Sequence, residues 1–220
     1  MSIFDAVGFQ WNRDSLPRCI QTHDIARVTF RLHKMLPEFV WDASMLEGNP
    51  ITYPEVQTLL DGVTVGGRKI SDQAQVLNLV QANKALLSMV KGGTFELSKS
   101  VFTKLHGLVA YQEALEWGVF RGEGDQIHYT PQVALGSRGR YTPVATEPGA
   151  LVLNELFATG VQSLNAECDP FERALVFFLF GALQQFFFDG NKRTSRMMMN
   201  GLLMAHGMDA ISVPAARGQE

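Results

Sequence analysis

The sequence predicts an all-α fold that carries one small β-hairpin. Over most of the chain, apolar residues recur at steps of three or four, which is the spacing of one face of a helix. A single Gly- and Pro-rich stretch, residues 118–146, interrupts this pattern and holds a short alternating run at 132–141. Since the chain has 220 residues, of which 46% are hydrophobic, it is long enough to bury a substantial core.

In the first half of the chain, helix boundaries are marked by capping and breaking residues. Pro37 is expected to kink or end the first helix. Thr52 and Glu55 have the spacing of a capping box, and Gly62 stops the short helix that follows. The predicted helices here span residues 21–39, 52–61, 71–91 and 97–115.

The second half resumes helical periodicity after the loop. Pro148 introduces one run, and Asp169 with Glu172 forms a second capping box ahead of a Phe-rich helix. These helices are predicted over 152–161, 170–188 and 193–206, the last capped by Gly207. A loop as long as 118–146 inside a compact domain is usually functional. No repeat or low-complexity linker divides the chain, so we expect one compact unit.

Composition argues against several functional classes. With 19 Lys and Arg against 22 Asp and Glu, the net charge is -3, which gives no general basis for binding nucleic acid or an anionic membrane. The apolar stretch 174–188 is shorter than the roughly 20 residues that cross a bilayer. Cys19 and Cys168 form no metal-ligand cluster, which disfavours a disulfide framework and a zinc site.

The N-terminal segment lacks the basic start and apolar run of a signal peptide. Together with the sparse cysteines, this leads us to expect a mature chain in a reducing cytoplasm.

The end of the Phe-rich helix carries the strongest chemical signal. Gly190 and Asn191 tolerate left-handed backbone, so successive N–H groups can converge there at the start of the next helix and bind an anion. Lys192, Arg193 and Arg196 add three positive charges, which suit a polyphosphate. A plain turn with a solvated first helical turn is the alternative, but basic residues at a helix start oppose the macrodipole and favour a bound anion.

Asp189 precedes these cations directly. A carboxylate beside a phosphate site is repulsive unless a divalent cation lies between them, and Mg²⁺ would resolve the conflict. The segment therefore predicts a site for a nucleotide, such as ATP, together with Mg²⁺.

The segment Asp189-Gly-Asn-Lys-Arg-Thr-Ser-Arg196 resembles the core motif of Fic-domain proteins. That motif reads His-Pro-Phe, a variable residue, Asp or Glu, Gly-Asn, Gly or Lys, Arg, two variable residues and Arg. The resemblance extends to Leu105-His106, Phe120-Arg121, Tyr141-Thr-Pro and Asp169-Pro-Phe-Glu-Arg. In the first half, Ser44-Met-Leu-Glu47-Gly-Asn49 resembles the inhibitory helix of self-inhibited members.

The resemblance implies a Fic-like core at 91–220 and a helical N-terminal region at 1–90 that carries the inhibitory motif 44–49. It implies protein adenylyltransferase (AMPylation) activity, in which AMP passes from ATP to a protein hydroxyl. By position, Asp189 would hold Mg²⁺, and the Gly190 and Asn191 backbone, Lys192 and Arg193 would bind phosphates. Arg196 would bind the terminal phosphate or, at rest, pair with Glu47. The hairpin near 133–140 would align a target protein by strand addition.

Three departures from the family pattern bear on activity. The catalytic His position is occupied by Gln185 and the adjoining Pro position by Phe186. Since Gln cannot accept a proton near neutral pH, loss of the base would cost roughly 10² to 10⁴ in rate. The hydroxyl residue expected four places before Glu47 is Ala43, with Ser44 adjacent. Lys192 also resembles the kinase-like Doc toxins, which transfer a γ-phosphate.

Other polar or sulfur residues have more ordinary interpretations. His106 is a weak candidate for a substitute base and His128 for a target contact, and a structural role is the more common one for each. Met197, Met198 and Met199 are expected to pack in the core.

Three functions are compatible with the sequence and with this resemblance. The favoured one is a Mg-ATP-binding adenylyltransferase whose activity is weakened by Gln185. The alternative is a non-catalytic nucleotide-binding or adaptor module, or a Doc-like phosphotransferase. We expect a protein target, no nucleic acid and no membrane as partners, and a homo-oligomer is compatible with the sequence.

Overall fold

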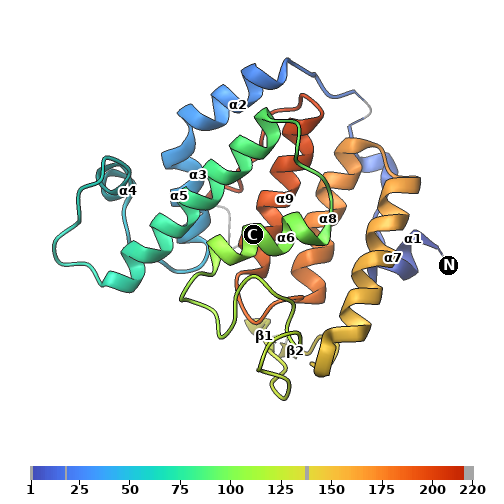
Figure 1. The fold of residues 1–220 in the computed structure, drawn as a ribbon. Helices are drawn as coiled ribbons and strands as arrows, with labels where there is room; N and C mark the ends of the chain where they lie inside the picture. Colours follow the sequence, from blue (N-terminus) through green and yellow to red (C-terminus); the bar gives the residue numbers. More distant parts are fainter. Residues whose placement is uncertain (1, 18, 137–138, 216–220) are drawn as a thin grey trace.

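Two helices, α8 (Pro170–Gln184) and α9 (Asn191–Ala205), lie side by side at the centre of the computed structural model, which describes residues 2–17, 19–136 and 139–215 (Figure 1). Apart from Lys192 and Ala205, every residue of α9 is buried. Met197, Met198 and Met199 are among them, which confirms their predicted place in the core. The start of α9 is therefore held rigidly by the centre of the molecule.

The other helices surround this pair. α6 (Lys99–Val109) and α5 (Ile70–Lys91) pack on α9 and on each other, and α7 (Leu151–Glu167) packs on α8. α2 (Ile25–Lys34) and α3 (Leu36–Met45) cover α5, and α4 (Tyr53–Leu60) packs on both α3 and α5. The short α1 (Ile3–Val7) lies against α7 on the opposite side of the molecule (Figure 1).

Side-chain caps explain where several helices begin. Thr52 and Glu55 form the predicted capping box, in which the Glu55 carboxylate accepts from the Thr52 N–H at 2.7 Å. The Asp169 carboxylate accepts from the N–H groups of Phe171 and Glu172 at 2.9 and 3.0 Å and so caps α8. Each cap satisfies backbone donors that the first turn of a helix leaves free.

Several predicted helix boundaries differ from the structure; α7, for example, ends at Glu167 instead of residue 161. The first predicted helix is divided at Met35, which confirms the break expected near Pro37, and Pro37 itself lies in the first turn of α3, where no N–H is needed from proline. α6 ends at Val109 instead of residue 115. α8 ends at Gln184 instead of residue 188, because Gln185 adopts left-handed backbone with φ of 51°.

The long loop holds the predicted hairpin in shortened form. β1 (Val133–Ala134) and β2 (Arg140–Tyr141) pair antiparallel, with Val133 opposite Tyr141 and Ala134 opposite Arg140. Part of the predicted 133–140 flap, Ser137 and Arg138, lies outside the described residues. With helices elsewhere, this small sheet confirms the predicted fold class.

Aromatic rings pack beneath the connection between α8 and α9. Phe102 of α6 lies 5.9 Å from Phe186 and 4.8 Å from Phe187, measured between ring centroids. Both rings of the connection are fully buried, and each contributes roughly 2 to 3 kcal/mol by removal from water. These two side chains therefore anchor the connection to the core. In the described part of the chain, none of the helices combines the length and apolar character that crossing a bilayer requires.

Candidate functional site

The site is built on residues 185–190, which connect α8 to α9 and which we call the motif loop. Gln185 begins it with left-handed backbone, and its side chain is 8% exposed. The Gln185 amide donates to the Ala182 carbonyl at 2.6 Å and accepts from the Asn191 side chain at 3.1 Å. Gln185 thus closes the end of α8 with its own side chain.

Asn191 fixes the other end of the motif loop. Its side chain donates to the Phe187 carbonyl at 2.8 Å and accepts from the Phe187 N–H at 2.9 Å. The Asn191 side chain therefore supports the loop from within, and its backbone N–H begins α9.

Arg121 holds the loop from below. This arginine is fully buried, and it donates to the Gln185 carbonyl at 2.6 Å and to the Thr146 hydroxyl at 2.8 Å. Its own backbone N–H donates to the Phe186 carbonyl at 2.9 Å. Burial lowers the pKa of Arg121 to about 10, which leaves it charged at neutral pH.

His106 has a structural role in this arrangement. Its Nδ1 accepts from the Gly118 N–H at 3.1 Å, so its Nε2 carries the proton and donates to the Asp189 carbonyl at 2.9 Å. The ring stacks on Phe187 at 3.6 Å between centroids. Burial lowers the pKa of His106 to about 4. With both nitrogens engaged, His106 does not present a base to a substrate, and His128 is exposed in the loop.

Gly190 shapes the start of α9. Its φ of 73° lies in the left-handed region, and a Cβ at this position would come within 3.3 Å of the Ala110 side chain and 3.4 Å of the His106 ring. The first N–H groups of α9 have no acceptor within the helix. The left-handed backbone predicted before this helix is therefore present at Gly190, whereas Asn191 is already the first residue of α9.

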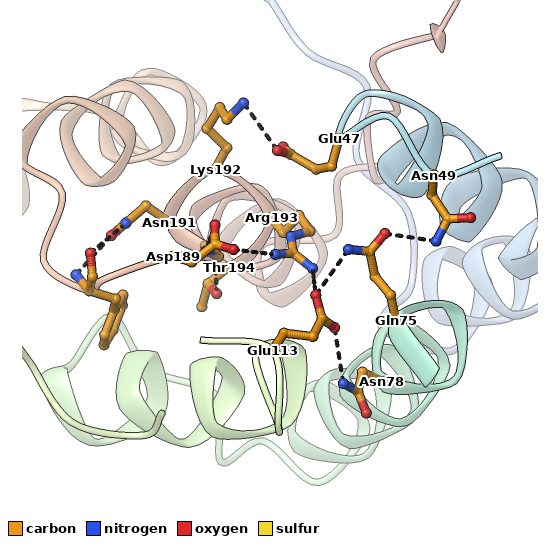
Figure 2. A network of polar contacts seen from close by, with 12 residues as sticks. Glu47, Asn49, Gln75, Asn78, Glu113, Asp189, Asn191, Lys192, Arg193 and Thr194 are labelled. Atoms are coloured by element: carbon orange, nitrogen blue, oxygen red, sulfur yellow. Dashed lines mark hydrogen bonds and ion pairs between the residues drawn. The ribbon is translucent and has the colours of Figure 1, made fainter. Parts of the chain in front are cut away.

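Two cations at this helix start, Lys192 and Arg193, lie against carboxylates (Figure 2). Lys192 Nζ lies 3.2 Å from Glu47 Oε2, and the lysine side chain is 53% exposed. Arg193 lies between two carboxylates, with Nη1 at 2.7 Å from Glu113 Oε2 and Nη2 at 3.5 Å from Asp189 Oδ2. Asp189 also accepts from the Gly190 N–H at 2.6 Å.

The predicted resting pair between Glu47 and Arg196 is not formed. Glu47 contacts Lys192 instead, while Arg196 Nε and Nη1 are buried without a hydrogen-bond partner among the described residues. Burial lowers the pKa of Arg196, although the nearby charges of Glu47 and Asp42 act in the opposite direction. The difference arises because Lys192 is one turn closer to the motif loop and extends from the exposed side of α9.

Ser44, the other residue of the predicted inhibitory motif, is fully buried. Its hydroxyl donates to the Trp41 carbonyl of its own helix at 2.9 Å. Ser44 therefore helps to end α3 just before the turn that carries Glu47.

A small cavity lies beside the two arginines, between α3, α5 and α9. Besides Arg193 and Arg196, its lining includes the polar side chains of Asn83, Asn200 and Ser212. Among the described residues, Arg193 Nε and Arg196 Nε and Nη1 are buried and have no hydrogen-bond partner. Buried donors of this kind are costly to leave unpaired, so they are candidate ligands for an anion.

The prediction from sequence missed Glu113 and the two amides that hold it. Gln75 and Asn78 of α5 donate to its carboxylate at 2.9 and 3.0 Å. No motif marks these residues, because Glu113 is 80 positions from Arg193 in the chain. Only the packing of α5 and α6 on α9 brings them together.

Comparison with known proteins finds two curated relatives that carry the same name. No protein-family model matches the chain. Protein adenylyltransferase fic-1 of Caenorhabditis briggsae is 29% identical over 194 residues, covering 83% of this chain and 35% of that protein. The protein of the same name from Caenorhabditis elegans is 27% identical with the same coverage. The chain thus spans about a third of the length of these curated relatives.

Solved structures share the fold at lower identity. A fragment of Fic-1 from C. elegans has a TM-score of 0.68 and 19% identity, covering 99% of this chain and 59% of that one. A Fic domain containing signaling protein from Bacteroides thetaiotaomicron has a TM-score of 0.70 and 18% identity, covering 98% and 76%. The helical fold, the left-handed Gly190 before α9 and these relatives agree, and together they support the assignment of the chain to the Fic family.

Proposed function

We propose that this protein binds Mg-ATP at the start of α9 and transfers AMP to a hydroxyl group of a protein, with low activity in the resting state. The observation that carries the proposal is the pair of buried arginines near the start of α9, Arg193 and Arg196, which together keep three donors without a partner in the part of the chain that the structure describes. Phosphate oxygens are the acceptors that suit such donors. Two curated relatives are named protein adenylyltransferases, which supports the same reaction.

Asp189 fits a role in holding Mg²⁺. Its side chain is 61% exposed, and its second oxygen lies 3.5 Å from Arg193, so it is accessible to a bound metal. Among the described residues no group of three or more acidic, His or Cys side chains forms a metal cage. Mg²⁺ commonly uses one or two carboxylates together with nucleotide phosphates, so a single aspartate is compatible. When bound, the ion would offset the negative charge of the phosphates beside Asp189.

The transfer forms a bond between the target oxygen and the α-phosphorus of ATP, breaks the bond to pyrophosphate and releases the hydroxyl proton. Arg193, Arg196 and the N–H groups at the start of α9 would orient the phosphates and stabilise their charge. Gln185 cannot receive the proton, and its amide is committed to Ala182 and Asn191. We therefore expect transfer to be slower by roughly 10² to 10⁴ than with a histidine at this position.

Glu47 is proposed to maintain the resting state. Its carboxylate neutralises Lys192 at 3.2 Å from the side of the N-terminal region. Across the site, the charges of Lys192, Arg193 and Arg196 are balanced by Glu47, Glu113 and Asp189. A triphosphate would enter a site with little net positive charge until Glu47 moves away. The target protein would lie along β1 and β2.

The test is the intact mass of the Glu47→Gly protein after incubation with Mg-ATP, alone and with a protein extract as the source of target. An added AMP on this chain or a target supports the proposal. An added phosphate would instead assign a Doc-like phosphotransferase, to which Lys192 points. Retention of Mg-ATP with no modification of any protein would contradict transfer.

One observation favours the second candidate, a nucleotide-binding module without catalysis. Gln185 occupies the position of the general base but has a structural role at the end of α8. It is 8% exposed, its amide nitrogen donates to the Ala182 carbonyl, and its amide oxygen accepts from the Asn191 side chain. In such a module, Mg-ATP binding would change the position of Glu47 and of the hairpin, and the surface offered to a partner protein would change with it. Binding of a partner that depends on Mg-ATP, with unchanged masses, would identify this function.

A further inference from the structure

Arg193 has an uneven set of contacts. Its side chain is 2% exposed, and Nη1 donates to Glu113 at 2.7 Å. In contrast, Nε is buried without a partner, and Nη2 has only the longer 3.5 Å contact with Asp189 among the described residues. Nε and Nη2 form one edge of the guanidinium group, which is the geometry that grips two oxygens of a phosphate.

Glu113 is itself held tightly. Gln75 Nε2 and Arg193 Nη1 both donate to its Oε2, at 2.9 and 2.7 Å, and Asn78 Nδ2 donates to its Oε1 at 3.0 Å. The Glu113 side chain is 16% exposed. Three donors therefore converge on one acceptor, and a carboxylate is the side-chain group that accepts at both oxygens without donating.

The backbone before Glu113 is unusual. Gln112 has a φ of 57°, one of three positive φ values recorded for non-glycine residues in the described chain. Such a conformation costs about 1 kcal/mol or more and persists when surrounding contacts impose it. Here the strained residue turns the chain directly after α6, so that the next side chain reaches α9 (Figure 2).

We propose that Glu113 is a positioning residue for nucleotide binding, which fixes one side of the Arg193 guanidinium so that the Nε and Nη2 edge is available to phosphate. This inference rests on the proposed function, since it assigns Arg193 to a phosphate. It extends the proposed nucleotide site by a carboxylate from outside the motif, Glu113, and by the two α5 amides that hold this carboxylate, Gln75 and Asn78. Since Gln75 also accepts from Asn49 at 2.8 Å, the support reaches the turn that follows Glu47.

The test compares Mg-ATP affinity in the Glu47→Gly background for Glu113→Gln, Arg193→Ala and the double variant, by calorimetry. Glu113→Gln places an amide donor among three donors, so we expect affinity to fall about tenfold because Arg193 loses its fixed orientation. In the Arg193→Ala background, the same substitution should change affinity less than about twofold, because the residue through which it acts is gone. Glu116→Gln removes the same charge from the same loop and should leave affinity unchanged.

The outcomes distinguish failure of the positioning role of Glu113 from failure of the proposed function. If the Glu47→Gly protein itself binds no Mg-ATP, the proposed function is wrong and this role falls with it. If it binds and Glu113→Gln has no effect, or has the same effect with and without Arg193, the positioning role alone is overturned. Glu113→Asp provides a second variant if Glu113→Gln does not fold. It keeps an acceptor-only side chain and should retain part of the affinity, whereas a complete loss would also contradict the inference.

Discussion

Removing the charge of Glu47 should tighten Mg-ATP binding. The Glu47 carboxylate lies 3.2 Å from Lys192 Nζ, with side-chain exposures of 18% and 53%. Two unit charges about 4 Å apart interact by about 1 kcal/mol in water and about 4 kcal/mol at the effective dielectric constant of a protein surface. Because Lys192 is half exposed, the lower end applies, and ion pairs of this kind contribute at most about 1 kcal/mol.

Glu47→Gln frees Lys192 and also removes one negative charge that would face the phosphates. Adding a repulsion of similar size gives at most about 2 kcal/mol in total, which corresponds to binding tighter by up to about thirtyfold. Calorimetric titration with Mg-ATP measures this directly. The gain should shrink at high salt, because salt screens partly exposed charges.

Glu38→Gln is the matched control for this prediction. Glu38 lies on the same helix as the Glu47 turn, and its side chain is exposed. It should bind Mg-ATP as the unmodified protein does. Equal affinity for Glu47→Gln and the unmodified protein, or a weaker affinity, would refute the view that Glu47 competes with phosphate for the cations of α9.

Three further predictions concern the metal, the missing base and a buried histidine. Asp189→Ala should abolish the Mg²⁺ dependence of ATP binding, measured by titration with and without the metal, and an unchanged dependence would remove Asp189 as its ligand. Gln185→His should raise AMP transfer by roughly 10²-fold in a radiolabel assay, and an equal rate would show that the lost base is not what limits transfer. The pKa of His106 is about 4 in the folded chain and 6.5 ordinarily, so the unfolded chain binds the proton first as pH falls. The free energy of unfolding should therefore decrease below pH 6.5 by about 1.4 kcal/mol per unit down to about pH 4. Urea titrations should show that this pH dependence of the free energy of unfolding is lost in His106→Gln and kept in the exposed control His128→Gln. If the pH dependence persists in His106→Gln, it does not arise from His106.

Local signals in the sequence predicted much of the fold. The capping residues Thr52 and Asp169 mark true helix starts, because a cap acts within three residues of itself. Boundaries that depend on tertiary packing were missed. α6 ends at Val109 even though apolar periodicity continues, because the following segment turns through Gln112 to bring Glu113 toward α9.

In the candidate site too, local features could be predicted from the sequence, whereas contacts that depend on tertiary packing could not. The turn at Gly190 and the cations that follow it are contiguous in sequence, and so they could be recognised there. The partner of each cation could not, because Glu47 and Glu113 approach α9 from turns that are distant in sequence, and only the tertiary packing decides which cation each one meets. Lys192 is therefore paired with Glu47 in place of Arg196.

The proposed function requires a phosphate site at the start of α9. A crystal structure of the Glu47→Gly protein grown with Mg-ATP tests this most directly. We predict that phosphate oxygens lie within hydrogen-bonding distance of the first N–H groups of α9 and of Arg193 and Arg196. Nucleotide bound elsewhere, or crystals grown at saturating Mg-ATP with no nucleotide at this helix, would contradict the proposed function.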